Sequence, residues 1–83
     1  MESLSDAHRA FGKELQRARK EKGVTQEALG RRVGLHATYI GDVERGERNV
    51  SLANILKIAR GIEVPASQLV AAAERHPLDR LSE

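Results

Sequence analysis

The feature that most constrains this fold is a pair of short helical segments, residues 26–33 and about 37–45, separated by Gly34. Thr25 precedes the first segment and is a residue type that caps helices by accepting a hydrogen bond from a free amide of the first turn. His36, or the chain just before it, is expected to cap the second segment. A glycine follows each segment and favours helix termination, because it takes a positive φ at little cost. The pattern therefore predicts two short helices joined by a turn of three or four residues.

The rest of the chain also carries helical patterns, and β-branched or aromatic residues never alternate with polar ones over a useful length. A first helix is expected over residues 5–22, ended by Gly23. A fourth should follow Ser51, and a fifth should run from Pro65 to about Arg75. The side chains expected to face inward are Ala7, Phe11, Leu15 and Ala18 in the first helix and Leu52, Ile55, Leu56 and Ala59 in the fourth. The fold class predicted is all-α with five helices.

Length and composition place this fold in one small domain. At 83 residues, a single hydrophobic core is only marginally stabilising, so support from a partner chain is plausible. We expect one domain over 1–83, with its core at about 7–75 and a flexible tail at 76–83. The absence of cysteine excludes disulfides and cysteine-ligated zinc, and the apolar stretches are far shorter than a membrane span. These features predict a cytoplasmic protein without membrane contact.

Charge is distributed unevenly along the chain. Residues 9–60 carry twelve Lys/Arg against six Asp/Glu, a formal charge of +6, whereas both ends are acidic and the whole chain is only +2. A basic middle fits an anion-binding core, although a solvated helical surface explains it equally well.

The stretch GVTQEALGRRVGLHATYIGDVERGERNVSL, followed by NILKIARGIEV, resembles the helix-turn-helix of Cro/cI-type (XRE) repressors, especially the controller proteins of restriction-modification systems. The resemblance covers roughly residues 11–72 and includes Gly30, where relatives usually have alanine at the crossing of the two helices. It implies a lambda-repressor-like domain whose second and third helices form the helix-turn-helix. It also implies a nucleoid-associated regulator that binds double-stranded DNA as a homodimer on paired half-sites.

The same resemblance assigns residues to the DNA interface. The face of the third helix opposite Ile40 and Val43 would enter the major groove. Base contacts carried over from the family are Ala37, Thr38, Tyr39 and Asp42. Controller relatives often have arginine where this sequence has Ala37, so base readout is expected to depend more on Thr38, Tyr39 and DNA shape.

Phosphate contacts are expected from the start of the second helix and from the loop after the third. The residues assigned to the DNA backbone are Arg19, Thr25, Gln26, Arg45, Arg48 and Asn49. The resemblance also implies an ion pair between Arg19 and Glu44 that fixes the third helix and orients Arg19 near the phosphates.

Gly41 and Asp42 are unusual in a helix that contacts DNA, because one is flexible and the other is negatively charged. A bare backbone at Gly41 would allow close approach to the groove. Asp42 could steer Arg45, three residues later, or accept a hydrogen bond from a cytosine amino group. Both roles for Asp42 remain open from the sequence.

Self-association is expected through the end of the fourth helix and the fifth helix, which are more apolar than a short terminal helix needs for its own packing. The interface residues predicted are Ile62, Val64, Leu69, Val70 and Ala73. An activator would also need a surface for RNA polymerase, for which Glu27, Asp42 and Glu47 are candidates.

Two classes of function remain. One is a transcription regulator, either a restriction-modification controller or a phage-type repressor. The other is a protein-interaction module, such as an antitoxin whose helix-turn-helix is autoregulatory. The three histidines form no metal-ligand spacing, and no phosphate-binding glycine loop or nucleophile elbow is present. We therefore expect no enzyme activity, metal, cofactor or small-molecule ligand.

Overall fold

The computed structural model describes residues 2–75, with side chains from residue 6 onward. The prediction of an all-α fold is confirmed, since this part of the chain consists of helices and their connections. The tail expected at 76–83 lies outside the described residues. The helices are α1 (Glu2–Glu21), α2 (Gln26–Val33), α3 (Ala37–Glu44), α4 (Leu52–Gly61) and α5 (Ala66–Glu74).

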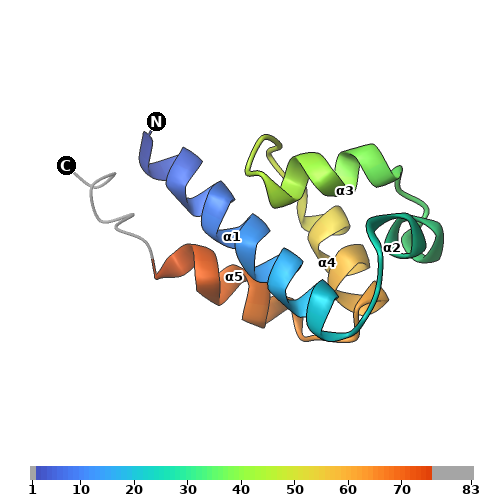
Figure 1. The fold of residues 1–83 in the computed structure, drawn as a ribbon. Helices are drawn as coiled ribbons and strands as arrows, with labels where there is room; N and C mark the ends of the chain where they lie inside the picture. The colour runs from blue at the N-terminus through green and yellow to red at the C-terminus, as the bar shows by residue number, and fades with distance from the viewer. Residues whose placement is uncertain (1, 76–83) are drawn as a thin grey trace.

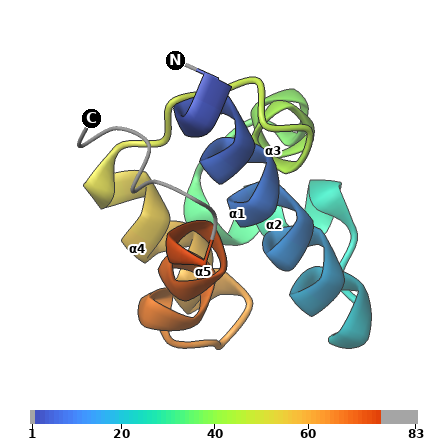
Figure 2. The ribbon, with the colours of Figure 1, turned by 90° about the vertical axis from the view of Figure 1, so that its left-hand side faces the viewer.

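Helix α1 is the longest of the described helices and lies at the centre of the domain. Helices α3 and α5 lie on opposite sides of it, and α5 runs back along α1 (Figure 1). Helix α2 packs against α3 and α4 near the C-terminal end of α1, and α4 closes the core against α5 (Figure 2). The arrangement holds the two short helices of the helix-turn-helix against three others, which compensates for their small length.

Each of the described helices contributes to one hydrophobic core. Its fully buried large side chains are Leu15, Leu29, Ile40, Val43, Ile58, Ile62 and Leu69. Phe11, Ala18, Val24 and Ala59 complete the cluster. Because each helix supplies at least one of these residues, the position of α3 depends on the packing of the whole domain.

The inward face of α4 differs from the sequence prediction. Leu52 is 71% exposed and Leu56 is 38% exposed, whereas Ile58 is fully buried. Ala59 is buried and Ile55 packs against the core, as expected, but packing against α2 and α5 turns the buried face toward Ile58 and Ile62. Leu52 and Leu56 are therefore left on the surface.

Two of the residues expected at a subunit interface also belong to the core. Ile62 is 1% exposed and Leu69 is fully buried, so neither can contact a second subunit in this fold. Val70 is 39% exposed, and Val64 and Ala73 are partly buried. The sequence prediction is corrected on this point, because the apolar excess of these segments is largely used within the chain.

Backbone contacts at two glycines set the helix crossings. A Cβ at Gly12 would overlap the carbonyl groups of Val43 and Glu44, where the end of α3 lies against α1. A Cβ at Gly30 would overlap the carbonyl oxygen of Leu35 in the turn. Side chains at either glycine would force α3 away from its neighbours.

Candidate nucleic-acid interface

The helix-turn-helix is capped at both helix starts. Thr25 Oγ1 accepts a hydrogen bond of 3.0 Å from the backbone N–H of Ala28 at the start of α2. His36 Nδ1 accepts one of 3.0 Å from the backbone N–H of Thr38 at the start of α3. Between the two helices, Gly34 adopts the left-handed conformation at φ 74°. These local contacts define the ends of the two short helices before any tertiary packing.

A buried ion pair joins α1 to the end of α3. Arg19 Nε lies 2.5 Å from Glu44 Oε2, and Arg19 Nη2 donates to Glu44 Oε1 at 3.0 Å. Arg19 Nη1 donates to the carbonyl oxygen of Val24 at 2.8 Å. The side chains of Arg19 and Glu44 are only 8% and 2% exposed. Arg19 is thus present in the implied ion pair, and the enclosure of its guanidinium counts against the phosphate contact expected from the sequence.

Glu44 also organises the start of α2. Gln26 Nε2 donates to Glu44 Oε1 at 3.0 Å, and Gln16 Nε2 approaches the same oxygen at 3.4 Å. The carboxamide of Gln26 therefore points toward the carboxylate, and its backbone N–H remains at the first turn of α2. One buried carboxylate links α1, α2 and α3.

Gly41 is buried, which corrects its expected place beside the groove. A Cβ built at Gly41 would lie 3.3 Å from Arg45 Nη1 and 3.6 Å from the Gln26 carboxamide. Flexible side-chain ends, rather than open space, therefore cover this part of α3. Gly41 provides room for these two side chains.

Asp42 holds two arginines at the end of α3. Its Oδ1 accepts a hydrogen bond of 2.5 Å from Arg45 Nη2, and Arg48 Nε lies 3.4 Å from Oδ2. The Asp42 side chain is 20% exposed, whereas those of Arg45 and Arg48 are 58% and 53% exposed. Arg45 also approaches Glu47 at 3.3 Å. Both Asp42 oxygens face cations of its own chain, an arrangement that favours steering over direct readout of cytosine.

Tyr39 faces α4 and the loop that follows α3. Its hydroxyl oxygen accepts a hydrogen bond of 3.0 Å from Asn54 Nδ2, and the Arg48 guanidinium carbon lies 5.3 Å from the centre of its ring. The ring is partly buried and packs against the core. The sequence reasoning missed Asn54, because nothing local indicates which helix the Tyr39 hydroxyl meets.

The remaining residues expected to contact DNA lie at the surface. Thr38 is exposed at the first turn of α3, with Ala37 partly buried beside it. Asn49 is exposed in the loop beyond Arg48. The structure thus brings Gln26, Gly41 and Arg45 together, and Asp42, which contacts both Arg45 and Arg48, connects this group to Tyr39.

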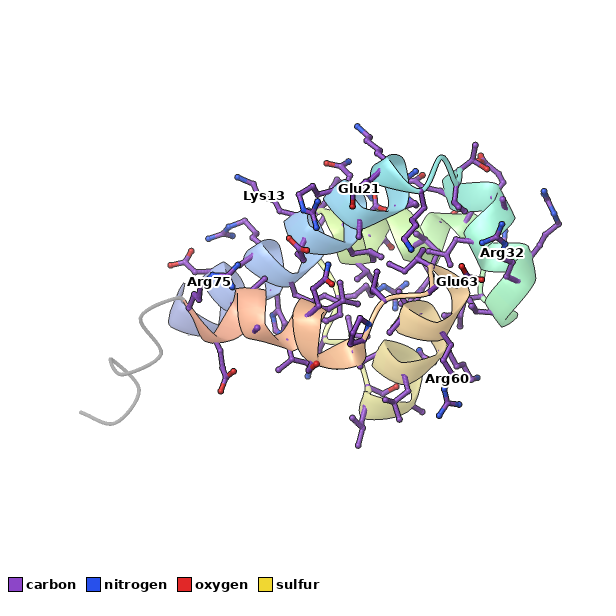
Figure 3. The ribbon with its side chains drawn as sticks, turned by 90° about the horizontal axis from the view of Figure 1, so that it is seen from below. Lys13, Glu21, Arg32, Arg60, Glu63 and Arg75 are labelled. Atoms are coloured by element: carbon purple, nitrogen blue, oxygen red, sulfur yellow. The ribbon has the colours of Figure 1, made fainter. Side chains whose placement is uncertain are left out.

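Basic side chains also gather at the ends of α1, α2 and α4. A hollow of about 590 Å³ lies there, with Lys22, Arg32, Lys57 and Arg60 among its lining residues. Figure 3 labels Arg32 on α2 near Glu63, which follows α4, and Arg60 in the last turn of α4. Arg32 Nη1 donates to the carbonyl of Gly61 at 2.9 Å, and Lys22 Nζ approaches that of Glu63 at 3.4 Å. Arg32 and Lys22 thus donate to carbonyls at the C-terminal end of α4 and just beyond it, where cations are favoured by the helix dipole.

Within residues 2–75, no group of three or more His, Asp or Glu side chains is placed to hold a metal ion. None of the described helices combines the length and apolarity needed to cross a membrane.

Comparison with known proteins agrees with this geometry. The model of the helix-turn-helix family HTH_3 matches residues 15–69. Control protein C.MunI from Mycoplasma sp is 37% identical over 73 residues, covering 87% of this chain and 99% of the relative. Control protein C.BamHI from Bacillus amyloliquefaciens is 44% identical over 61 residues, covering 72% and 75% of the two chains.

Among solved structures, the restriction-modification controller protein C.AhdI from Aeromonas hydrophila is 46% identical, with a TM-score of 0.72 over 74% of this chain and 92% of that one. Relatives of this kind are DNA-binding regulators rather than enzymes, in agreement with the sequence prediction. The chain belongs to the helix-turn-helix (XRE-type) family of DNA-binding transcription regulators, in which restriction-modification control proteins are among its relatives.

Proposed function

We propose that this regulator acts as a homodimer on paired operator half-sites and controls expression of a restriction-modification system. The observation that supports DNA binding is the buried Arg19–Glu44 pair. This pair fixes α3 against α1 and leaves Thr38 and Arg45 of the helix-turn-helix exposed, where they can meet DNA. Similarity to control proteins supports the assignment to restriction-modification genes. A DNA-bound regulator of this kind would reside with the nucleoid in the cytoplasm.

The proposed base contacts lie at the start of α3. Thr38 is placed to use its hydroxyl or methyl group on a base edge, with Ala37 beside it. Asp42 is assigned to steering Arg45 and Arg48, because both of its oxygens already face those arginines. Asp42→Asn tests this assignment: steering predicts a uniform loss of affinity across DNA sequences, whereas direct readout predicts lost preference at one base pair.

The proposed phosphate contacts are the first turn of α2, with Thr25 and Gln26, and the cations Arg45 and Arg48 with Asn49 nearby. Two exposed arginines per subunit neutralise about four phosphates in a dimer, so affinity should fall roughly a hundredfold between 50 and 200 mM salt. Fluorescence anisotropy with a labelled operator measures this slope. Salt-independent binding would refute the electrostatic assignment.

The proposed subunit interface draws on the exposed apolar side chains of α4 and α5, Leu52, Leu56 and Val70, together with the partly buried Val64 and Ala73. Among the side chains that the structure describes, Leu52 is the most exposed large apolar one, so Leu52→Lys should leave the monomer folded while it weakens the dimer. We expect the unaltered chain to sediment at about twice its monomer mass at micromolar concentration. Ala53→Lys, at an exposed neighbour, is the control. An undiminished dimer in Leu52→Lys would place the interface elsewhere.

Activation would require contact with RNA polymerase as well. Glu27 and Glu47 are exposed and remain candidates for that surface, whereas Asp42 is engaged by two arginines. Selection of bound sequences from random DNA tests the central proposal. Enrichment of a paired motif supports a dimeric regulator, and failure to enrich one would favour the antitoxin or interaction-module alternative. Neighbouring genes, a methyltransferase with an endonuclease or a toxin, provide an independent check.

A further inference from the structure

Asn54, on the first turn of α4, makes a hydrogen bond that crosses to the proposed DNA-reading helix. Its Nδ2 donates to the hydroxyl oxygen of Tyr39 on α3 at 3.0 Å, in a partly buried position. The backbone N–H of Asn54 is itself capped by Ser51 Oγ at 3.1 Å. The donor therefore stands on a capped helix turn, and it restrains the hydroxyl end of the Tyr39 side chain.

Tyr39 in turn supports an arginine from the loop between α3 and α4. The Arg48 guanidinium carbon is 5.3 Å from the centre of the Tyr39 ring, a distance at which a cation is attracted to the aromatic face. Asp42 Oδ2 restrains the same guanidinium from α3, 3.4 Å from Arg48 Nε. A side chain that would otherwise sample many rotamers is thus restrained from two directions.

The outer part of Arg48 remains available. Its side chain is 53% exposed, and within the described residues only Nε is committed to a protein acceptor. The two terminal nitrogens carry four further N–H donors, in a geometry suited to a phosphate oxygen pair. Restraint of the ring and of Nε leaves the phosphate-binding end of this side chain free.

We infer that Asn54 is a positioning residue of the DNA interface: it holds Tyr39, and Tyr39 holds Arg48 in the orientation that meets the DNA backbone. This inference rests on the proposed function. It moves Tyr39 from a base contact to a support for a phosphate contact. It also gives α4, a helix outside the helix-turn-helix, a defined part in DNA binding.

The test measures operator affinity for Asn54→Ala, Arg48→Ala and the double variant by fluorescence anisotropy at fixed salt. Asn54→Ala should weaken operator binding about threefold to tenfold, because the Arg48 side chain then has to be ordered when DNA binds. In the Arg48→Ala background the same substitution should have no further effect on affinity. A purely structural role would weaken binding equally in both backgrounds, so persistence of the loss without Arg48 overturns the inference.

Two further variants keep the test decisive. Tyr39→Phe keeps the ring and removes only the hydroxyl, so it should reproduce the loss seen in Asn54→Ala without disturbing the helix start. Gln68→Ala is the matched control, because Gln68 Nε2 makes a comparable partly buried bond of 2.9 Å to Glu14 between α5 and α1. The Gln68→Ala variant should bind the operator as tightly as the unaltered protein.

Failure of the inference is distinguishable from failure of the proposed function. If the unaltered protein enriches no DNA motif, the proposed function fails. If it binds a selected operator and Asn54→Ala binds equally well, only the role of Asn54 is overturned.

Discussion

Replacement of Glu44 by glutamine should destabilise the domain strongly, although it keeps the size and shape of the side chain. In the folded protein, Arg19 directs Nε and Nη2 to this carboxylate at 2.5 and 3.0 Å, and both side chains are almost fully enclosed. A glutamine amide would place N–H donors against the guanidinium and leave its charge without a partner. Removal of one member of a buried pair costs about 3–5 kcal/mol.

That cost is large for a chain of this length. Typical stabilities of about 0.05–0.15 kcal/mol per residue correspond to roughly 4–12 kcal/mol for 83 residues. At about 4 °C or more per kcal/mol, the melting temperature should fall by at least about 12 °C. Burial also predicts that the loss changes little with added salt, since screening acts mainly on exposed charges.

Urea unfolding followed by circular dichroism measures the effect. The control is Glu47→Gln, because Glu47 is 60% exposed and approaches Arg45 at 3.3 Å on the surface. That variant should stay within about 0.5 kcal/mol of the unaltered protein. An unfolding free energy for Glu44→Gln within about 1 kcal/mol of the unaltered protein would refute the argument that this carboxylate holds α3 in place.

Three further outcomes follow from individual contacts. Gly30→Ala should destabilise the domain, measured by thermal unfolding, because the overlap with the Leu35 carbonyl outweighs a gain of about 1 kcal/mol in helix propensity; a higher melting temperature would contradict this. Gly41→Ala should raise the melting temperature through most of this gain in helix propensity, because the atoms nearest to the new Cβ are the ends of the Arg45 and Gln26 side chains. A large loss of stability would show that these two side chains cannot move aside. A hydrogen bond from Arg17 holds the pKa of Glu14 below its ordinary value, so this carboxylate favours the folded state at neutral pH. The contribution should be lost as pH falls below about 4.5 and through the lowered pKa, and Glu14→Gln should flatten the acid side of the stability profile; an identical profile would exclude it.

Much of the helix-turn-helix could be predicted from local sequence. The caps at Thr25, His36 and Ser51 form as expected, each through a side chain that accepts a bond from the first turn of its own helix. Helix limits differ from the predicted ones mainly at the start of α1, which begins at Glu2 rather than at about residue 5. Capping and glycine termination act over a few residues, so the sequence carries them directly.

Which side chains of the site are exposed and which are enclosed was harder to predict from the sequence. The Arg19–Glu44 pair implied by the resemblance is present, but the sequence did not show how fully Glu44 and Val24 enclose the guanidinium, nor that the ends of Arg45 and Gln26 cover Gly41. An arginine has the same local pattern whether it points to solvent or to a carboxylate 25 residues away. The distinction depends on how α1 crosses α3.

The sequence by itself determined the number of helices, their caps and the tight turn at Gly34, because these depend on near neighbours along the chain. The tertiary structure alone decided which apolar residues of α4 are buried, enclosing Ile58 while leaving Leu52 and Leu56 outside, and which residue meets the Tyr39 hydroxyl. Leu52 and Leu56 satisfy the same helical spacing as the buried residues of α4, and a hydrogen bond between residues 39 and 54 has no local signature. Packing against the other helices selects between such alternatives, because only one choice fills the core without leaving a cavity or an unpaired polar group.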